Sequence, residues 1–587
     1  MNNSLPDRMS PRDHASWDLG LLAAIVLPML FAVPFLGKAY HVDDPLFVWT
    51  AQQIVEHPMD FYGFQANWER SAAWMYKIQQ NPPLLSYYLA PFGAMFGWAE
   101  LVLHLALLPL TALAGAGIYL LARQFCGNPN IALATAIVSP AFLLSATQVM
   151  SDIPMLALYV WALYLWIRGV ERDTAALCIL AGVLIGLGAL TKYFAATAIP
   201  LLAVYTVMQG PSRLRYLTYF LVPFFMLVGY EFLTYRLYGL GLLADAFSFA
   251  QEHRTDWGAS APIKAMNTLV FLGGCVLPVL CLLPWMLSQR ALRVVLGLFA
   301  VTIAVCYLLP NTAPEWLDTW HPMKISHPLN FADPGMSIYR MDIRIRPLPP
   351  QMAQWALWLC TGILIFGLFV ADIVRHRDAK SLLLLLWFVG TFVFVAFVNH
   401  HVNARVILPV VPAVAMVCAR RMEAMEKTPS APHPLLQAWP LAPALVLSLV
   451  LATADYRLAG SAKEAAHDIM AAEYTGTVWF SGHSGFQYYM EDLGAESIDV
   501  HKSFGMPGDT FVQPSNNWFP LLIGPHVAGE HEIIEYAAFP FVTTSHFQRY
   551  AGFYSDYTGP LPFMFGSIPM EQYLLVEIRL QINVGDI

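Results

Sequence analysis

Two adjacent carboxylates stand near the start of the chain, in the segment 40–45, which reads Tyr-His-Val-Asp-Asp-Pro. A carboxylate can take the proton of an attacking hydroxyl group, which is the role of a general base. Asp44 before Pro45 is also typical of a helix N-cap followed by proline in the first turn, which needs no catalytic role. That interpretation accounts for Asp44 and leaves Asp43 without a structural reason. Either aspartate is therefore a candidate base.

A third carboxylate and two cations also lie where apolar runs begin or end. Asp152 belongs to the segment Ser-Asp-Ile-Pro at 151–154, where it serves either as a helix cap or as a second acidic group. Lys192 separates two apolar runs, and Arg405 begins another. Such cations either extend toward lipid headgroups or hold a phosphate group, and their spacing leaves both roles open.

The adjacent histidines His400 and His401 raise the question of a metal ion. Adjacent side chains on a helix point apart, and no set of further ligands accompanies the pair. We therefore predict no metal site, and a divalent cofactor has no support from a ligand set.

The elements that position these residues are apolar helices. Hydrophobic residues make up 57% of the 587 residues and charged residues only 12%, which is about half the charge content of a soluble domain. A membrane span needs about 20 apolar residues. The sequence predicts a polytopic α-helical membrane protein with thirteen spans, at about 21–37, 99–122, 130–148, 153–167, 175–190, 194–208, 216–235, 267–288, 291–309, 352–374, 381–398, 405–419 and 440–453.

The charges of the connecting loops predict the orientation of the spans. With the N-terminus inside, every short loop on that side carries Arg or Lys, as cytoplasmic loops do. The long loops 38–98, 236–266 and 310–351 then face outward, together with the acidic pair, Asp152, Lys192 and Arg405. The apolar run 84–97 would reverse this order if it crossed the bilayer, so we expect it to be an interfacial helix on the outer surface.

The C-terminal part differs from the rest in composition. Residues 454–587 hold 16 Asp and Glu against 5 Lys and Arg, whereas the whole chain has a net charge of −8. Strand-like runs lie at 477–480, 532–539 and 573–582, after a helical stretch at 462–473. We predict a membrane domain at 1–453 and a small soluble α/β domain at 454–587 on the outer side. Such an acidic domain does not suit nucleic acid or anionic lipid.

Five motifs in this order resemble the GT-C superfamily of membrane glycosyltransferases, in particular the bacterial relatives of protein O-mannosyltransferases and aminoarabinose transferases. They are the acidic pair at 43–44, Pro-Pro-Leu at 82–84, Ser-Asp-Ile-Pro at 151–154, the segment 186–192 that ends in Thr-Lys, and Arg-Val-Ile-Leu-Pro-Val-Val-Pro at 405–412. The segment 482–491 is a weaker match to the C-terminal domain of some members. One departure is Asn81, because the aminoarabinose transferases have a lysine before Pro-Pro.

The resemblance implies an inverting glycosyltransferase in the inner (plasma) membrane. It would move a sugar from a polyprenyl-phosphate-linked donor to a hydroxyl group of a lipid, glycan or protein acceptor on the outer face. In this interpretation the base is Asp44 or Asp43, Asp152 is the second acidic group, and Lys192 and Arg405 neutralise the lipid phosphate. Further substrate-binding candidates from the first outer loop are His41, Asn81 and Tyr88.

Two other classes of protein deserve comparison. A transporter or flippase of a lipid-linked sugar should carry ionisable groups near the middle of the bilayer and paired broken helices. Here the ionisable candidates lie at the predicted outer ends of the spans, and no internal repeat is visible. A non-catalytic scaffold would leave unexplained why acidic and basic groups gather on one side. We therefore favour the transferase over both.

Overall fold

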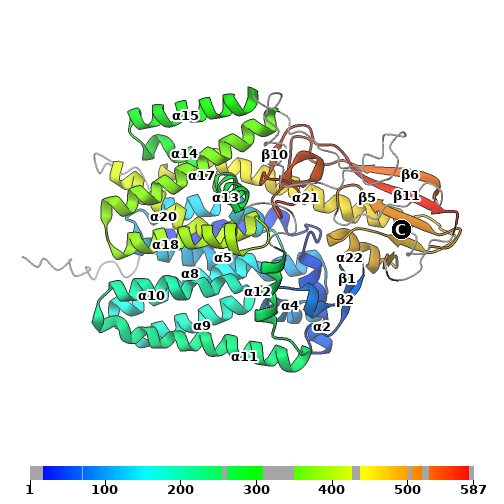
Figure 1. Ribbon diagram of the computed structural model, residues 1–587, viewed down its shortest axis with the longest axis horizontal. Coiled ribbons are helices and arrows are strands. Elements are labelled where there is room, and N and C mark those ends of the chain that lie inside the picture. The colour runs from blue at the N-terminus through cyan, green and yellow to red at the C-terminus, as the bar shows by residue number, and fades with distance from the viewer. Residues whose placement is uncertain are drawn as a thin grey trace, which may run out of the picture.

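A computed structural model describes residues 18–68, 71–253, 261–308, 349–425, 436–499, 501, 505–517 and 528–580. Most of the chain is helical, and strands gather in the C-terminal part (Figure 1). The helices up to residue 308 are α1 (Leu19–Ala32), α2 (Asp44–Glu56), α3 (Met75–Ile78), α4 (Leu84–Phe96), α5 (Glu100–Phe125), α6 (Pro129–Ile137), α7 (Pro140–Ser145), α8 (Asp152–Arg172), α9 (Ala175–Thr191), α10 (Ala198–Met208), α11 (Leu221–Tyr238), α12 (Leu242–Glu252), α13 (Ala261–Cys275), α14 (Pro278–Met286) and α15 (Gln289–Leu308). The later helices are α17 (Pro349–His376), α18 (Ala379–Val393), α19 (Ala404–Ile407), α20 (Val411–Met425), α21 (Ala442–Ala471) and α22 (Ser484–Asp492).

Helices lie at all the positions where spans are predicted. In the described residues seven helical segments are long and apolar enough to cross a bilayer, and α13 with α14 form an eighth candidate that is bent by 78°. Three further predicted spans are apolar helices that are shorter than a full span. The segments 130–148 and 405–419 are broken into short helices, where Pro140, Pro409 and Pro412 remove main-chain donors. The helical membrane-protein class is confirmed, and the number thirteen stays a prediction.

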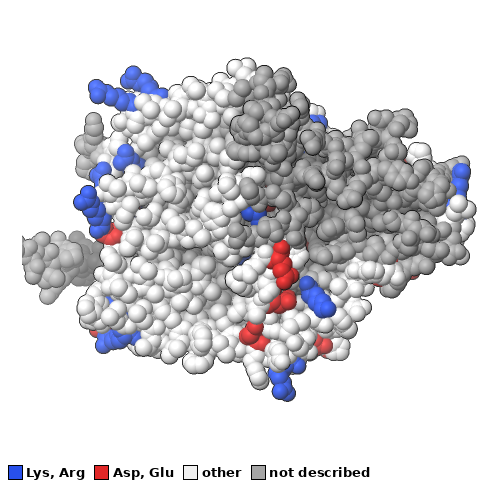
Figure 2. All heavy atoms as spheres, viewed as in Figure 1, with Lys and Arg blue, Asp and Glu red and all other residues white. Residues whose placement is uncertain are grey.

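One end of the helical bundle is basic. Lys380 lies 3.3 Å from Glu171, and Arg420 lies 3.1 Å from Asp372, so the ends of α8, α17, α18 and α20 meet here. Figure 2 shows Lys and Arg side chains gathered at the left-hand end of the helices. The loops that the sequence predicts to be cytoplasmic therefore lie together. Which side of a membrane this end faces stays a prediction.

Residues 38–98, which the sequence predicts to be the first outer loop, fold against the opposite end of the bundle. Helices α2 and α4 of this segment pack together, and the hydroxyl of Ser86 on α4 donates to the carbonyl of Phe47 on α2 at 3.0 Å. The predicted interfacial segment 84–97 is helical as α4. Strands β1 (Gln65–Asn67) and β2 (Ala72–Trp74) form an antiparallel hairpin beyond α2.

The C-terminal part is built on a mixed five-stranded sheet with the order β4-β3-β5-β11-β6. The strands of this part are β3 (Val478–Phe480), β4 (Glu496–Ser497), β5 (Thr510–Pro514), β6 (Ala528–Tyr536), β7 (Val542–Thr543), β8 (Ser545–His546), β9 (Ala551–Gly552), β10 (Met564–Phe565) and β11 (Glu571–Ile578). Helix α21 runs without a break from residue 442 to 471, so the predicted domain boundary at 453–454 falls inside a helix. The helical stretch predicted at 462–473 is the end of this helix.

The C-terminal part packs closely on the first outer loop. A Cβ atom at Gly485, at the start of α22, would lie 1.8 Å from the carbonyl oxygen of Tyr40, so only glycine fits at this contact. The hydroxyl of Tyr489 on α22 donates to Glu100 at 2.7 Å and accepts the main-chain N–H of Tyr40, also at 2.7 Å. These contacts fix the segment that leads into the acidic pair.

Candidate functional site

The site lies at the end of the bundle opposite the basic loops. Arg405, at the start of α19, forms an ion pair with Asp43 at 2.8 Å. Lys192, which follows α9, forms an ion pair with Asp152 at the start of α8 at 2.6 Å. The structure therefore brings the predicted acidic and basic residues together in pairs, although they come from four segments that are far apart in the sequence.

A strained turn separates the roles of the two adjacent aspartates. Val42 has a φ of +49°, in the left-handed region that β-branched residues rarely adopt. Asp44 closes this turn, because its carboxylate accepts the main-chain N–H of His41 at 2.9 Å while its own N–H donates to the carbonyl of His41 at 3.0 Å. Strained backbone of this kind clusters at functional sites.

Asp44 is a buried connector between two loops. Its side chain is fully buried, and its second oxygen accepts the main-chain N–H of Val149 at 3.0 Å. Burial raises the pKa of Asp44 from 3.8 to about 7, against the opposing effect of the Lys38 ammonium. Asp43 differs from it, because its side chain is 30% exposed. Of the two candidates, Asp43 is the carboxylate that a substrate can reach.

Two local features hold Arg405 in place. The side chain of Asn403 caps α19 by accepting the main-chain N–H of Val406 at 2.9 Å. The guanidinium also donates to the sulfur of Met150 at 2.8 Å, and its carbon lies 6.0 Å from the centre of the Tyr554 ring. Arg405 is therefore anchored from three directions, by α2, the 148–152 loop and the C-terminal part.

Several buried polar atoms at this end have no hydrogen-bond partner in the described part of the chain. They are Nε of Arg405, Nε2 of His41, Nδ1 of His401 and Oε1 of Gln148. Burial lowers the pKa of His41 to about 4, so its imidazole is neutral at physiological pH. Buried polar groups are nearly always paired in folded proteins, and unpaired ones are expected where a ligand supplies the partner.

The sequence analysis missed a second ion pair beside the first. Lys38 and Asp455 are fully buried and form a hydrogen-bonded ion pair. Asp455 also accepts the hydroxyls of Thr544 and Tyr554, each at 2.6 Å. The amide of Gln148 donates to both Asp455, at 3.3 Å, and Tyr554. A charged residue in the last apolar helix is itself a signal of a specific role, and it could have marked Asp455 from the sequence.

The C-terminal part supplies a clamp for the loop before Arg405. Asp556 accepts the main-chain N–H of Val402 at 2.9 Å, and its own N–H donates to the carbonyl of Val402 at 2.8 Å. The N–H of Ala404 donates to the carbonyl of Phe553, also at 2.8 Å. Burial raises the pKa of Asp556 to about 6. The predicted separate domain therefore contributes main-chain and side-chain contacts to the site.

The structure does not join two of the predicted substrate-binding residues to the ion pairs. The carbonyl of Asn81 accepts the hydroxyl of Tyr62 at 2.5 Å, and its side chain donates to Gln79 at 3.3 Å within its own loop. The hydroxyl of Tyr88 donates to the carbonyl of Ala106 at 2.7 Å, which ties α4 to α5. Both residues are engaged in holding the first outer loop.

The two adjacent histidines differ from the expectation for their segment. They lie between the π-helical turn that ends α18 and the start of α19, and their ring centroids are 4.0 Å apart in an edge-to-face contact. The side chains therefore do not point apart. Among the described residues no group of three or more His, Cys, Asp or Glu side chains is placed to hold a metal ion.

Comparison with known proteins bears on part of the chain. Residues 80–235 match the model of a family described as dolichyl-phosphate-mannose-protein mannosyltransferase. This stretch includes Pro82-Pro83, Asp152 and Lys192. The resemblance to GT-C membrane glycosyltransferases is thereby confirmed. An uncharacterized protein of Aquifex aeolicus (strain VF5) is 30% identical over 165 residues, which are 27% of this chain and 33% of the relative's length.

Solved structures of membrane proteins are also similar to the chain. The apo oligosaccharyltransferase of Archaeoglobus fulgidus has a TM-score of 0.45 at 15% identity, over 83% of this chain and 66% of that one. The oligosaccharyltransferase AglB of the same organism, in complex with an inhibitory peptide and a dolichol-phosphate, has a TM-score of 0.46 at 14% identity, over 85% and 70%. Apo ArnT from Cupriavidus metallidurans has a TM-score of 0.41 at 15% identity, over 85% and 92%.

Proposed function

We propose that the chain is an inverting glycosyltransferase that moves a sugar from a polyprenyl-phosphate donor to an acceptor hydroxyl group. The observation that carries this proposal is the arrangement at one end of the bundle. An accessible carboxylate, Asp43, lies beside Arg405, whose buried Nε has no partner among the described residues. The match of residues 80–235 to a family named for a lipid-phosphate sugar donor supports the same chemistry.

The reaction needs one proton acceptor and a site for negative charge. The acceptor oxygen forms a bond to the anomeric carbon while the bond from that carbon to the phosphate oxygen breaks. The hydroxyl proton passes to a carboxylate, and the electron pair of the broken bond leaves with the lipid phosphate. Attack from the face opposite the leaving group inverts the anomeric carbon. No acid is required, because a phosphate ester leaves as a stable anion.

Asp43 suits the role of base better than Asp44. Both oxygens of Asp44 accept main-chain N–H groups, and its side chain is fully buried. The carboxylate of Asp43 is 30% exposed and lies 2.8 Å from the guanidinium of Arg405. Asp44 is then a positioning residue that closes the turn at Val42 and aims Asp43 outward.

Arg405 and Lys192 are the residues that offset the charge of the leaving phosphate. The buried Nε of Arg405 has no hydrogen-bond partner among the described residues, and guanidinium groups bind phosphate in a forked geometry. The side chain of Lys192 is 17% exposed, and its ammonium is held by the buried carboxylate of Asp152. Groups fixed in place before the reaction stabilise the developing charge without further reorganisation. Asp152 acts through Lys192 in this scheme.

The proposal is tested on the envelope of cells that lack the protein. Glycolipids and glycoproteins are compared by mass spectrometry in cells without the gene, in cells with the wild-type protein and in cells with Asp60→Asn. Asp60 is an exposed acid of the same outer loop and serves as a control. We expect one class of molecules to lose a sugar mass without the protein and both complemented strains to regain it. Identical glycolipids and glycoproteins in all strains would overturn the proposal.

A further inference from the structure

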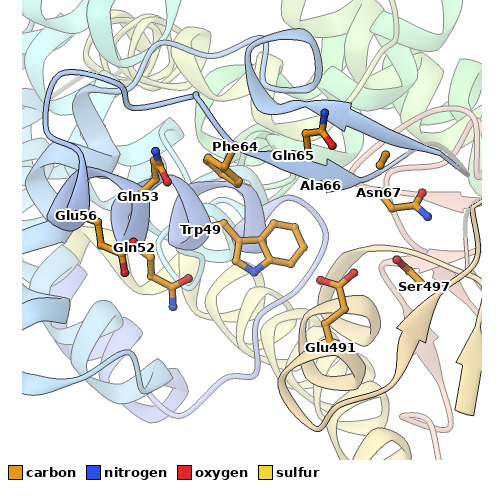
Figure 3. A pocket seen from close by; sticks show the side chains of 11 residues that line it. Trp49, Gln52, Gln53, Glu56, Phe64, Gln65, Ala66, Asn67, Glu491 and Ser497 are labelled. Carbon is orange, nitrogen blue, oxygen red and sulfur yellow. The ribbon is translucent and has the colours of Figure 1, made fainter. Parts of the chain in front are cut away.

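A cavity of about 440 Å³ lies beside α2, outside the ion-pair site. Three parts of the chain line it: α2, the β1–β2 hairpin and the C-terminal segment with α22 and β4 (Figure 3). The volume is in the range of small-molecule sites in proteins. The lining residues on which the argument rests are Trp49, Gln52, Gln53, Glu56, Asn67 and Glu491.

One face of α2 lines this cavity. Trp49, Gln52, Gln53 and Glu56 follow one another at helical spacing, so they share one stripe of the helix. The opposite stripe, which includes Phe47, Ala51 and Ile54, is buried. A polar stripe with a single large aromatic ring at one end is thus turned toward the cavity, as Figure 3 shows.

An aromatic cluster holds Trp49 in place. Its ring lies 6.2 Å from that of Trp68, which it meets edge to face, and 6.0 Å from that of Tyr488 on α22. The ring is half-buried and still lines the cavity. A rigid aromatic face of this kind offers a flat, electron-rich surface to a ligand.

The polar lining is rich in amides and carboxylates. Asn67 is 9% exposed, and its Oδ1 has no hydrogen-bond partner in the described part of the chain. The carboxylate of Glu491 accepts from the amide of Gln487 at 2.8 Å and points toward the cavity in Figure 3. No Lys or Arg is among the described lining residues. Because Glu56 and Glu491 bring carboxylates to the lining, it favours uncharged or amino-bearing ligands with many hydroxyl groups and disfavours anions.

We infer that this cavity binds a saccharide that is uncharged or carries amino groups. A sugar ring has one face of polarised C–H groups, which stacks on an aromatic face, and vicinal hydroxyls around its edge, which both donate to and accept from amides and carboxylates. Glu56 and Trp49 are on the helix that begins beside Asp43, about 20 and 9 Å along the axis from it. If the proposed function holds, this saccharide is the part of the acceptor next to the reacting hydroxyl group.

Saturation-transfer NMR on the purified full chain tests the inference. Oligosaccharides released from the envelope are separated by charge into neutral, amino-bearing and acidic pools, and digalacturonic acid serves as a defined anion. We expect saturation transfer from the protein to oligosaccharides of the neutral or the amino-bearing pool. Trp49→Ala should weaken that binding about tenfold, which corresponds to the stacking energy, whereas Trp49→Phe should keep most of it. Trp74→Ala is the matched control, because Trp74 is exposed on the hairpin and does not line the cavity.

Several results would contradict the saccharide site. They are an absence of saturation transfer to every pool, a preference for the acidic pool or digalacturonic acid, and equal saccharide binding by wild type and Trp49→Ala. Asp43→Asn separates this inference from the proposed function. If Asp43→Asn loses sugar transfer and wild type binds no saccharide, only the saccharide site is wrong. If wild type binds saccharide and Asp43→Asn retains full transfer, only the catalytic proposal is wrong.

Discussion

Two neighbouring ion-pair clusters consist of the same kinds of chemical groups and have different roles. In the first, Lys38 and Asp455 are both 0% exposed, and two hydroxyls and an amide donate further hydrogen bonds to the carboxylate. In the second, Asp43 is 30% and Arg405 12% exposed, and Nε of the guanidinium has no partner among the described residues. A closed pair, which is buried and whose carboxylate accepts hydrogen bonds at both oxygens, holds structure. An open pair, which is partly exposed and has one donor without a partner among the described residues, can exchange its partners for a substrate.

The closed cluster joins three parts of the chain. Lys38 follows the first apolar helix, Asp455 lies in α21, and Thr544 and Tyr554 come from the C-terminal part. These hydrogen bonds hold the C-terminal part against the end of the bundle that carries the candidate site. Breaking the two clusters should therefore have different consequences.

The largest effect is expected from breaking the closed pair. Lys38→Met leaves the Asp455 carboxylate buried without its cation, which costs about 3–5 kcal/mol of the free energy of unfolding. The double variant Lys38→Met/Asp455→Leu removes both charges and should recover most of that loss. Thermal unfolding in detergent micelles measures both. A double variant as unstable as Lys38→Met would show that the pair is not the main element of the anchor.

A slightly smaller effect, on rate and not on stability, is expected at the open pair. Arg405→Ala removes one preformed donor for the phosphate and should lower the transfer rate about 10²–10³-fold. Arg405→Lys keeps the charge, loses the fork and should restore the rate only in part. The control is Arg213→Ala at the basic end, where Arg213 pairs with Asp173. The assignment fails if Arg405→Ala and Arg213→Ala transfer sugar equally well.

A single hydrogen bond of the closed cluster should have a more modest effect. Thr544→Val removes the hydroxyl that donates to Asp455 at 2.6 Å. Loss of a bond to a charged group costs about 1.5–3 kcal/mol. We expect a lower unfolding temperature with an unchanged transfer rate at temperatures where the protein is folded. A rate that falls while the unfolding temperature holds would assign Thr544 to the reaction instead.

A further effect concerns pH and the connector Asp44. Its folded-state pKa of about 7 is above the ordinary value of 3.8, so the folded protein binds this proton more tightly than the unfolded chain does. The stability that protonated Asp44 contributes is fully present below about pH 4 and is lost as the pH rises to about 7. The unfolding temperature of wild type should thus fall over this window more than that of Asp44→Asn. Parallel pH profiles in the two proteins would contradict the shift.

The sequence allowed the helices and the charged residues at their ends to be predicted, because both depend on local patterns. Apolar runs mark the helices, and acids or cations at their ends mark Asp43, Asp152, Lys192 and Arg405. The choice between Asp43 and Asp44 could not be made from the sequence. It depends on the turn at Val42 and on a hydrogen bond to Val149, which is 105 residues from Asp44.

The pairing of Lys38 with Asp455 could not be predicted, for a related reason. Lys38 and Asp455 are 417 residues apart, and nothing in their local sequence pairs them. The boundary at residue 454 was placed by a change in charge, whereas the helix continues because its apolar face still has partners to pack against. Asn81 and Tyr88 were chosen for their place in the first outer loop, and their polar groups are used within that loop and its contact with α5.

The central claim is that Asp43 accepts the proton of the attacking hydroxyl. The most direct test supplies wild type, Asp43→Asn and the control Asp60→Asn, each in lipid nanodiscs, with membrane lipids from cells that lack the protein. Mass spectrometry follows the loss of the polyprenyl-phosphate sugar and the gain of sugar on the acceptor. We predict that Asp43→Asn lowers the rate about 10²–10⁴-fold with an unchanged unfolding temperature, and that Asp60→Asn matches wild type. Transfer by Asp43→Asn at the wild-type rate would contradict the claim.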